Sequence, residues 1–177
     1  MDKAELNFAD GTILVVDDEP GIVEVMVDCL APLGAKIKTA SNGVEALAIV
    51  KTGVIDAVVS DVKMPNMTGL QLLAEIRGMG YLTPFVIVTG YGDKQTMIEA
   101  IRLDATDFLD KPFNTDEVFK VMTRALSLGL LQRKAESQID RVYGSSSLPA
   151  DEIVKAKKYQ KVMARMRIEM EVFKKKA

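Results

Sequence analysis

The sequence predicts an α/β fold, a doubly wound (βα)5 parallel sheet that is followed by a helical tail. Two observations carry this prediction. Five short runs of apolar and β-branched residues alternate with five segments of helical periodicity, which is the pattern of a parallel sheet covered by helices on both faces. Beyond about residue 128 the helical spacing continues, but no further strand pattern follows.

Composition justifies each of the five strands. The first run is continuous in apolar and β-branched residues, as in a strand buried on both faces, whereas the second run alternates like a half-buried edge strand. Each run is followed by a polar residue or a glycine. The predicted strands are residues 12–16, 35–40, 55–60, 84–89 and 106–109.

The helices between the strands have recognisable ends. Pro20 suits the first turn of the first helix, and Pro32 and Gly34 end it. The Ser-Asn-Gly sequence at 41–43 has the turn and cap chemistry that precedes a second helix. The remaining helices are expected at 66–77 before two glycines, from a cap at Asp93 to about residue 103, and from residue 114 onward.

Composition also excludes several classes of protein. The chain has 177 residues, of which 48% are hydrophobic and 27% charged, which is the balance of a folded domain. No apolar run reaches the roughly 18 residues of a membrane span. Residues 1–10, the expected N-terminal lead, lack the pattern of a signal peptide, so we expect a cytoplasmic protein.

The counts of cysteine and histidine further limit the kinds of disulfide, catalytic site and metal site that the chain can form. A single cysteine excludes an internal disulfide, and the absence of histidine excludes histidine-dependent catalytic triads and most zinc sites. Any metal is therefore expected to be held by oxygen, which favours Mg²⁺, Mn²⁺ or Ca²⁺.

Charge divides the chain into two parts. Residues 1–128 carry 11 Lys and Arg against 19 Asp and Glu, whereas residues 151–177 carry 9 against 4. An acidic body with a basic tail indicates two structural parts.

Chemistry-bearing residues follow the predicted strands. Asp17 and Asp18 follow the first strand, Asp61 follows the third, Thr89 ends the fourth, and Lys111 comes shortly after the fifth. Because the functional crevice of such a sheet lies at the carboxyl ends of its strands, we expect these side chains on one rim. Clustered carboxylates need a cation, for which Mg²⁺ is well suited. A carboxylate nucleophile beside a hydroxyl and an ammonium suits phosphoryl transfer to an aspartate.

Five separated elements carry a resemblance to a known family. They are Asp17-Asp18, the run DVKMPNMTG that Asp61 opens, Thr89-Gly90, Phe108 and Lys111-Pro112. In order and spacing, residues 11–128 resemble the receiver domain of bacterial two-component response regulators. The chain as a whole resembles a chemotaxis-regulator-like receiver with a C-terminal helical extension, and the resemblance implies a flavodoxin-like sheet.

The resemblance implies a phosphorylation site. Asp61 is the expected phosphoacceptor, which forms an aspartyl phosphate. The expected cofactor is Mg²⁺ (or Mn²⁺), bound directly by Asp18 and Asp61, through water by Asp17, and by the backbone carbonyl of Lys63. Lys111 is expected to contact the phosphoryl oxygens.

The resemblance also implies a switch. Thr89 is expected to swing towards the phosphoryl group, and Phe108 to move inward as Thr89 vacates its space. Phe108 lacks the tyrosine hydroxyl that many relatives have there, which removes a hydrogen bond but not the switch. Side chains two residues past the acceptor and two past the threonine tune access of the hydrolytic water in this family. We therefore expect Lys63 and Tyr91 to lengthen the life of the phosphoryl group.

Taken singly, each of these residues has a structural explanation. An Asp-Asp pair after a strand is usually a helix cap, and a lysine before proline is usually just exposed. Only the joint pattern on one rim favours the functional interpretation. Asp104, Asp107 and Asp110 have the spacing of a metal cluster but are interpreted as a solvated acidic loop.

Residues 129–177 are predicted to form a helical extension with a break near 144–147, where the sequence reads Gly-Ser-Ser-Ser. The fifth helix is expected to continue to about residue 143, and a further helix follows from about residue 151. Its apolar stripe needs a partner, which is the receiver itself, a second copy in a coiled coil, or another protein. Its lysines suit nucleic acid or an anionic membrane, but a solvated cationic face is the simpler interpretation, and scarce aromatic residues disfavour nucleic-acid binding.

These observations predict a response regulator of a two-component phosphorelay. A histidine kinase or phosphotransfer protein donates the phosphoryl group, and a conformational switch then signals to a protein partner or a homodimer through the face of the fourth and fifth helices and the tail. We expect a regulatory protein that catalyses only its own phosphorylation and dephosphorylation, not an enzyme. The alternatives are a nucleic-acid or transcription regulator acting through the basic tail, and an unphosphorylated scaffold.

Overall fold

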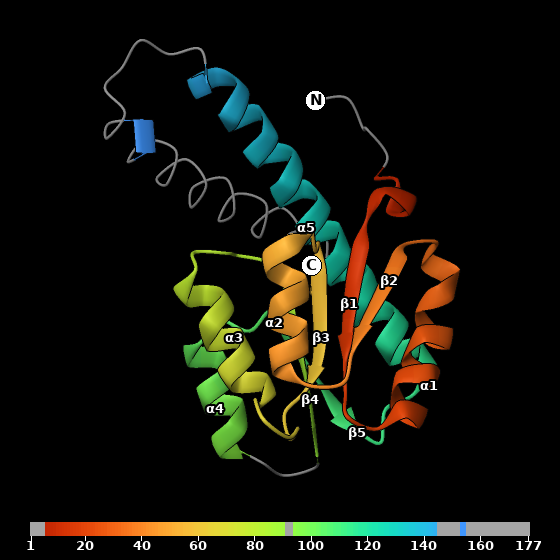
Figure 1. The fold of residues 1–177 in the computed structure, drawn as a ribbon. Helices are drawn as coiled ribbons and strands as arrows, with labels where there is room; N and C mark the ends of the chain where they lie inside the picture. The colour runs from red at the N-terminus through yellow and green to blue at the C-terminus, as the bar shows by residue number, and fades with distance from the viewer. Residues whose placement is uncertain (1–5, 91–93, 145–152, 155–177) are drawn as a thin grey trace. The chain divides into compact units, whose positions relative to one another are not determined.

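A computed structural model describes residues 6–90, 94–144 and 153–154, and Figure 1 shows its fold. The chain divides into two compact units, Met1–Ser127 and Leu128–Ala177. The first unit contains the sheet and the candidate site. Among the described residues, none of the helices combines the length and the apolar character that crossing a bilayer requires.

Five parallel strands form one sheet in the order β2-β1-β3-β4-β5, which confirms the predicted doubly wound fold. The strands are β1 Thr12–Val16, β2 Lys36–Ala40, β3 Ala57–Asp61, β4 Phe85–Gly90 and β5 Asp107–Lys111. The three inner strands are almost wholly buried, as their continuous apolar sequences require. The edge strand β2 exposes Lys36, Lys38 and Thr39, as its alternating sequence indicates.

Three strands end later than their sequences indicate, and β4 does so by one residue, at Gly90. β3 includes Asp61, and β5 continues through Asp110 to Lys111 because its ladder with β4 runs on to the Gly90–Lys111 pair. The acidic residues look like strand terminators in the sequence. In the structure the parallel ladder carries β3 and β5 into the polar rim of the sheet.

Apart from the two helical residues at 153–154, the described part of the chain contains five α-helices, which connect and follow the strands. They are α1 Pro20–Leu30, α2 Gly43–Thr52, α3 Gly69–Gly78, α4 Lys94–Arg102 and α5 Thr115–Gly144, with short 3-10 turns at Phe8–Asp10 and Ala31–Leu33. In Figure 1, α2 lies in front of the sheet and the first turns of α5 lie behind it. Since helices cover both faces, a ligand can reach the sheet only at the ends of its strands.

Caps fix the starts of the helices that surround the candidate site. The Asn42 side chain accepts a hydrogen bond from the Glu45 amide at the start of α2. α3 starts at Gly69 and not at residue 66, because Asn66 adopts a left-handed conformation with φ 66° and Thr68 forms a capping box with Gln71. The predicted cap at Asp93 lies outside the described residues.

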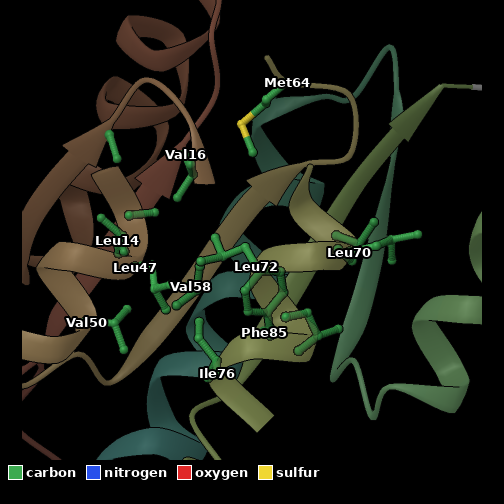
Figure 2. Packing of buried hydrophobic residues seen from close by; sticks show 14 of the residues in the cluster. Leu14, Val16, Leu47, Val50, Val58, Met64, Leu70, Leu72, Ile76 and Phe85 are labelled. Carbon is green, nitrogen blue, oxygen red and sulfur yellow. The ribbon is translucent and has the colours of Figure 1, made fainter. Parts of the chain in front are cut away.

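The core on the α2–α3 side of the sheet is made of aliphatic residues and one ring. Leu14, Val58, Leu72, Ile76 and Phe85 are fully buried there, as Figure 2 shows. Burial of each such side chain contributes roughly 1.5–3 kcal/mol. This packing holds β1, β3 and β4 rigidly, and these strands carry most of the candidate site.

α5 is much longer than the other helices that pack on the sheet. It runs for 30 residues, and in its C-terminal part Leu128 and Leu130 are buried whereas Val142 is 68% exposed. The predicted break near 144–147 and the further helix from residue 151 lie outside the described residues, except for Gly144 and for two helical residues at 153–154.

Candidate functional site

The carboxyl ends of the strands place three of the predicted residues beside one another. Asp17 directly follows β1, Asp61 ends β3, and Lys111 ends β5. Asp17 is 4% exposed and Asp61 is 8% exposed. Two buried carboxylates are costly without a positive charge nearby, so the sequence requires a cation at this rim.

Lys111 supplies that cation. Its Nζ lies 2.6 Å from Oδ1 of Asp61 and 3.2 Å from Oδ2 of Asp17. Burial lowers the pKa of Lys111, but the hydrogen bonds and negative charges of Asp61 and Asp17 outweigh burial, so its pKa is raised above the ordinary value. The ammonium therefore stays protonated at neutral pH and is shared by the two carboxylates.

Backbone amides hold the remaining carboxylate oxygens. The Lys63 amide donates to Oδ2 of Asp61 at 2.6 Å, and the Glu19 amide donates to Oδ1 of Asp17 at 2.9 Å. Hydrogen bonds to an ionised acceptor are among the stronger ones in proteins. Each carboxylate is thus oriented by one amide and one ammonium, which leaves its outer lone pairs for a ligand.

The loop that follows Asp61 is fixed at both ends. The Val62 amide donates to the Val88 carbonyl at 3.1 Å, and the Gly69 amide donates to the Val62 carbonyl at 3.0 Å. Gly69 is required here, because a Cβ at this position would lie 2.2 Å from the Asp61 carbonyl oxygen. The loop therefore returns tightly against the strand that carries the candidate phosphoacceptor.

Other predicted site residues lie near this cluster without joining its hydrogen bonds. Asp18 and the Lys63 side chain are exposed, and Thr89 is buried at 3% exposure with its hydroxyl 3.4 Å from the Gly90 carbonyl. Phe108 is half-buried and packs against the core cluster. Tyr91 lies outside the described residues.

The donor set suits a hard divalent cation. Within the described part of the chain, no three acidic or cysteine side chains gather closely enough to hold a metal by themselves. Asp17 and Asp61 converge on one ammonium, and Mg²⁺ in proteins is typically held by one or two carboxylates and several waters. The residues present therefore fit Mg²⁺, with Asp18 and the Lys63 carbonyl as the remaining predicted oxygen donors.

The acidic stretch at 104–110 is not a metal cluster in the structure. Asp107 forms an ion pair with Arg124 of α5, and the Asp104 carboxylate lies 3.9 Å from Nε of Arg77. The Arg77 guanidinium also donates to the Asp104 carbonyl at 3.0 Å. The interpretation as a merely solvated loop missed these arginines, which are distant in sequence and carry no motif.

Comparison with known proteins agrees with this geometry. The chain is 34% identical over 122 residues to the regulatory protein AtoC of Escherichia coli (strain K12), covering 69% of this chain and 26% of that protein. It is 37% identical over 117 residues to the DNA-binding transcriptional regulator NtrC of Salmonella typhimurium, covering 66% of this chain and 25% of that protein. The chain thus spans about a quarter of the length of these curated relatives.

Solved structures point to the same part of the chain. The chemotaxis protein CheY4 of Vibrio cholerae superposes with a TM-score of 0.62 at 32% identity, covering 66% of this chain and 98% of that one. The family model described as the response regulator receiver domain matches residues 13–123. Members of this family typically bind Mg²⁺ and have a cognate kinase. The chain therefore belongs to the response regulator receiver domain family, whose members are regulatory phosphoacceptors of two-component signal transduction and not classical enzymes.

Proposed function

We propose that Asp61 accepts a phosphoryl group from a histidine kinase or a phosphotransfer protein in the presence of Mg²⁺. The observation that carries the proposal is the Lys111 ammonium, which lies between Asp61 and Asp17 at a buried rim. A positive charge held beside a carboxylate nucleophile is where the charge of a transferring phosphoryl group needs stabilisation.

The chain's own residues account for the main steps of such a transfer. An oxygen of Asp61 attacks phosphorus and forms an O–P bond, while the P–N bond to the donor histidine breaks and its electron pair leaves with the imidazole. Lys111 neutralises the phosphoryl oxygens, and the Lys63 amide orients the nucleophile. Asp17, Asp18, Asp61 and the Lys63 carbonyl would hold Mg²⁺, which when bound supplies further charge neutralisation.

The switch is proposed to run from β4 to β5. Thr89 is buried on β4, and Phe108 lies on β5 in the neighbouring register, since Ile87 pairs with Phe108 and Thr89 with Asp110. Movement of Thr89 towards a phosphoryl group on Asp61 would open space beside the half-buried Phe108 ring. The exposed apolar residues Ile98 and Ile101 of α4 and Phe119 of α5 support a readout by a protein partner or a second copy.

Labelling tests the proposal directly. Wild-type protein incubated with radiolabelled acetyl phosphate and Mg²⁺ should incorporate one phosphoryl group, and Asp61→Asn should incorporate none. Asp110→Asn is the matched control, because it removes an exposed carboxylate next to Lys111 without touching the nucleophile. Absence of Mg²⁺-dependent label on the wild type would favour the unphosphorylated scaffold instead.

The lifetime of the phosphoryl group is proposed to depend on Lys63 and Tyr91. Lys63 is exposed two residues past Asp61, and Tyr91 follows Thr89 by two residues. Their bulk would shield the phosphoryl group from the hydrolytic water. Tyr91→Ala should then lose its label faster than the wild type, and an unchanged decay rate would contradict this role.

Light scattering tests whether phosphorylation changes the oligomeric state of the protein. Mass in solution is measured with and without Mg²⁺ and beryllofluoride, which mimics the phosphoryl group. A change in mass that Asp61→Ala abolishes would support phosphorylation-dependent assembly through the C-terminal helices. A constant dimer would mean a permanent oligomer, and a constant monomer would point either to a tail that folds back on the receiver or to another protein as the partner. Salt-sensitive binding to DNA would favour the nucleic-acid alternative.

A further inference from the structure

The start of α2 touches the loop that follows Asp61. The Gly43 amide donates to the Met67 carbonyl at 3.2 Å. A Cβ on Gly43 would lie 2.6 Å from Cγ of Met67, 2.8 Å from its carbonyl oxygen and 2.9 Å from its Cβ. Because two of these three atoms cannot be moved by rotating the Met67 side chain, any larger residue at position 43 displaces the loop backbone.

The loop between this contact and the candidate site is stiff. The φ of Pro65 is fixed by its ring, Asn66 is held at φ 66°, and the Met67 amide donates to the Pro65 carbonyl at 2.7 Å. At the other end, the Lys63 amide is hydrogen-bonded to Asp61. A displacement at Met67 is therefore carried along a short constrained segment to Lys63 and is not absorbed by free torsions.

We infer that Gly43 is a positioning residue for the phosphoacceptor loop, and that it sets the place of the Lys63 backbone relative to Asp61. The inference rests on the proposed function, since it assigns a role to a residue that touches neither the nucleophile nor the proposed metal donors. Its consequence is that α2, through its first residue, controls how well Mg²⁺ is held at the site.

The dependence on Mg²⁺ separates positioning from a merely structural role. If the loop is displaced, the Lys63 carbonyl becomes a poorer donor, so the Mg²⁺ concentration that gives half-maximal labelling rises. The labelling rate at saturating Mg²⁺ falls much less. If the substitution only lowers stability, the amount of labelled protein falls at every Mg²⁺ concentration and the half-saturating concentration does not change.

The experiment compares Gly43→Ala with Gly21→Ala. Both glycines lie in the first turn of a helix, but a Cβ on Gly21 would meet nothing within 4 Å. Each variant is labelled with acetyl phosphate over a Mg²⁺ series, and Mg²⁺ binding is measured by calorimetry without any phosphodonor. We expect roughly a tenfold weaker affinity for Mg²⁺ in Gly43→Ala, as with other residues that orient metal ligands, and no change in Gly21→Ala.

The outcomes distinguish a failure of the proposed function from a failure of the role assigned to Gly43. Wild-type protein that takes no label contradicts the proposed function, whatever the variants do. Wild-type protein that is labelled, with Gly43→Ala matching Gly21→Ala in Mg²⁺ affinity, overturns the role of Gly43 and leaves the proposed function standing. If Gly43→Ala does not fold, Met67→Gly is measured instead. It removes both side-chain atoms that approach Gly43 and frees the backbone torsions of the loop at this position, so an unchanged Mg²⁺ affinity would overturn the inference as well.

Discussion

At the scale of single residues, the protonated Lys111 links the stability of the fold to pH. Its pKa is raised in the folded chain from the ordinary value of 10.5. A raised folded-state pKa contributes stability that is fully present below the unfolded-state pKa and is lost as the pH rises through the folded-state value. Lys111 therefore stabilises the fold at neutral pH and ceases to do so in alkali.

We predict a pH-dependent difference between the wild type and Lys111→Met. In the absence of Mg²⁺, the difference in unfolding free energy should be constant between pH 7 and pH 9 and should shrink as the pH rises through the ordinary lysine pKa of 10.5, at which half of the unfolded lysine has lost its proton. Urea unfolding at a series of pH values measures it. Lys120→Met, at an exposed position of α5, is the control and should show no such trend. A difference independent of pH would mean that Lys111 acts through packing alone.

The site could be predicted in part from the sequence. Asp17, Asp61 and Lys111 were expected on one rim because parallel strands bring their carboxyl ends together, and the structure places them within one set of contacts. What the sequence could not indicate is that Lys111 contacts both carboxylates at once. The close approach of Gly43 to Met67 was also missed, because it depends on tertiary packing and not on any local pattern.

At the scale of elements, the start of α3 determines where the phosphoacceptor loop ends. The Thr68 hydroxyl accepts from the Gln71 amide at 3.2 Å, and the Gln71 side chain accepts from the Thr68 amide at 2.9 Å. Together with the left-handed Asn66, this capping box delays the helix by three residues relative to the 66–77 range predicted from periodicity. Periodicity locates the apolar face of a helix, but the cap and the backbone conformation decide its first residue.

We predict that Thr68→Ala destabilises the receiver by about 1 kcal/mol, because it removes the acceptor of the Gln71 amide. Thr52→Ala is the matched control. Its hydroxyl donates to the Ala48 and Ile49 carbonyls at the exposed end of α2, so its loss should change stability by less than about 0.5 kcal/mol. Chemical denaturation of both variants measures the effect. Equal values for the two would show that the capping box adds nothing to stability.

At the scale of the whole molecule, the proposed Mg²⁺ site couples ligand binding to folding. Its proposed donors come from the residues that follow β1, from the end of β3 and from the loop after β3, which are adjacent only in the folded chain. A ligand that binds only the folded state stabilises it by mass action, by about 2.7 kcal/mol at a ligand concentration one hundred times the dissociation constant.

We therefore predict that the melting temperature rises steadily with the logarithm of the Mg²⁺ concentration, as followed by scanning calorimetry. Asp17→Asn should flatten this dependence, because it removes one of the two buried carboxylates. Asp28→Asn, on the exposed face of α1, should leave it intact. A dependence that persists in Asp17→Asn would place the metal elsewhere.

The fold as a whole was predictable because its signals are redundant. Five apolar runs and five helical segments specify the same doubly wound sheet, and the strand order confirms it. The exact strand ends were less predictable, since β5 carries Asp107, Asp110 and Lys111 into the ladder at a polar edge. Charged residues are tolerated there because one side of an edge strand faces water.

The other edge of the sheet has a consequence for colloidal behaviour. β2 pairs only with β1 among the strands of the sheet, so its outer backbone groups could template the addition of a strand from another molecule. Its exposed lysines, Lys36 and Lys38, place like charges where two such edges would meet. The strand that forms this edge of the sheet therefore also carries, in its two lysines, a charge repulsion that opposes edge-to-edge aggregation.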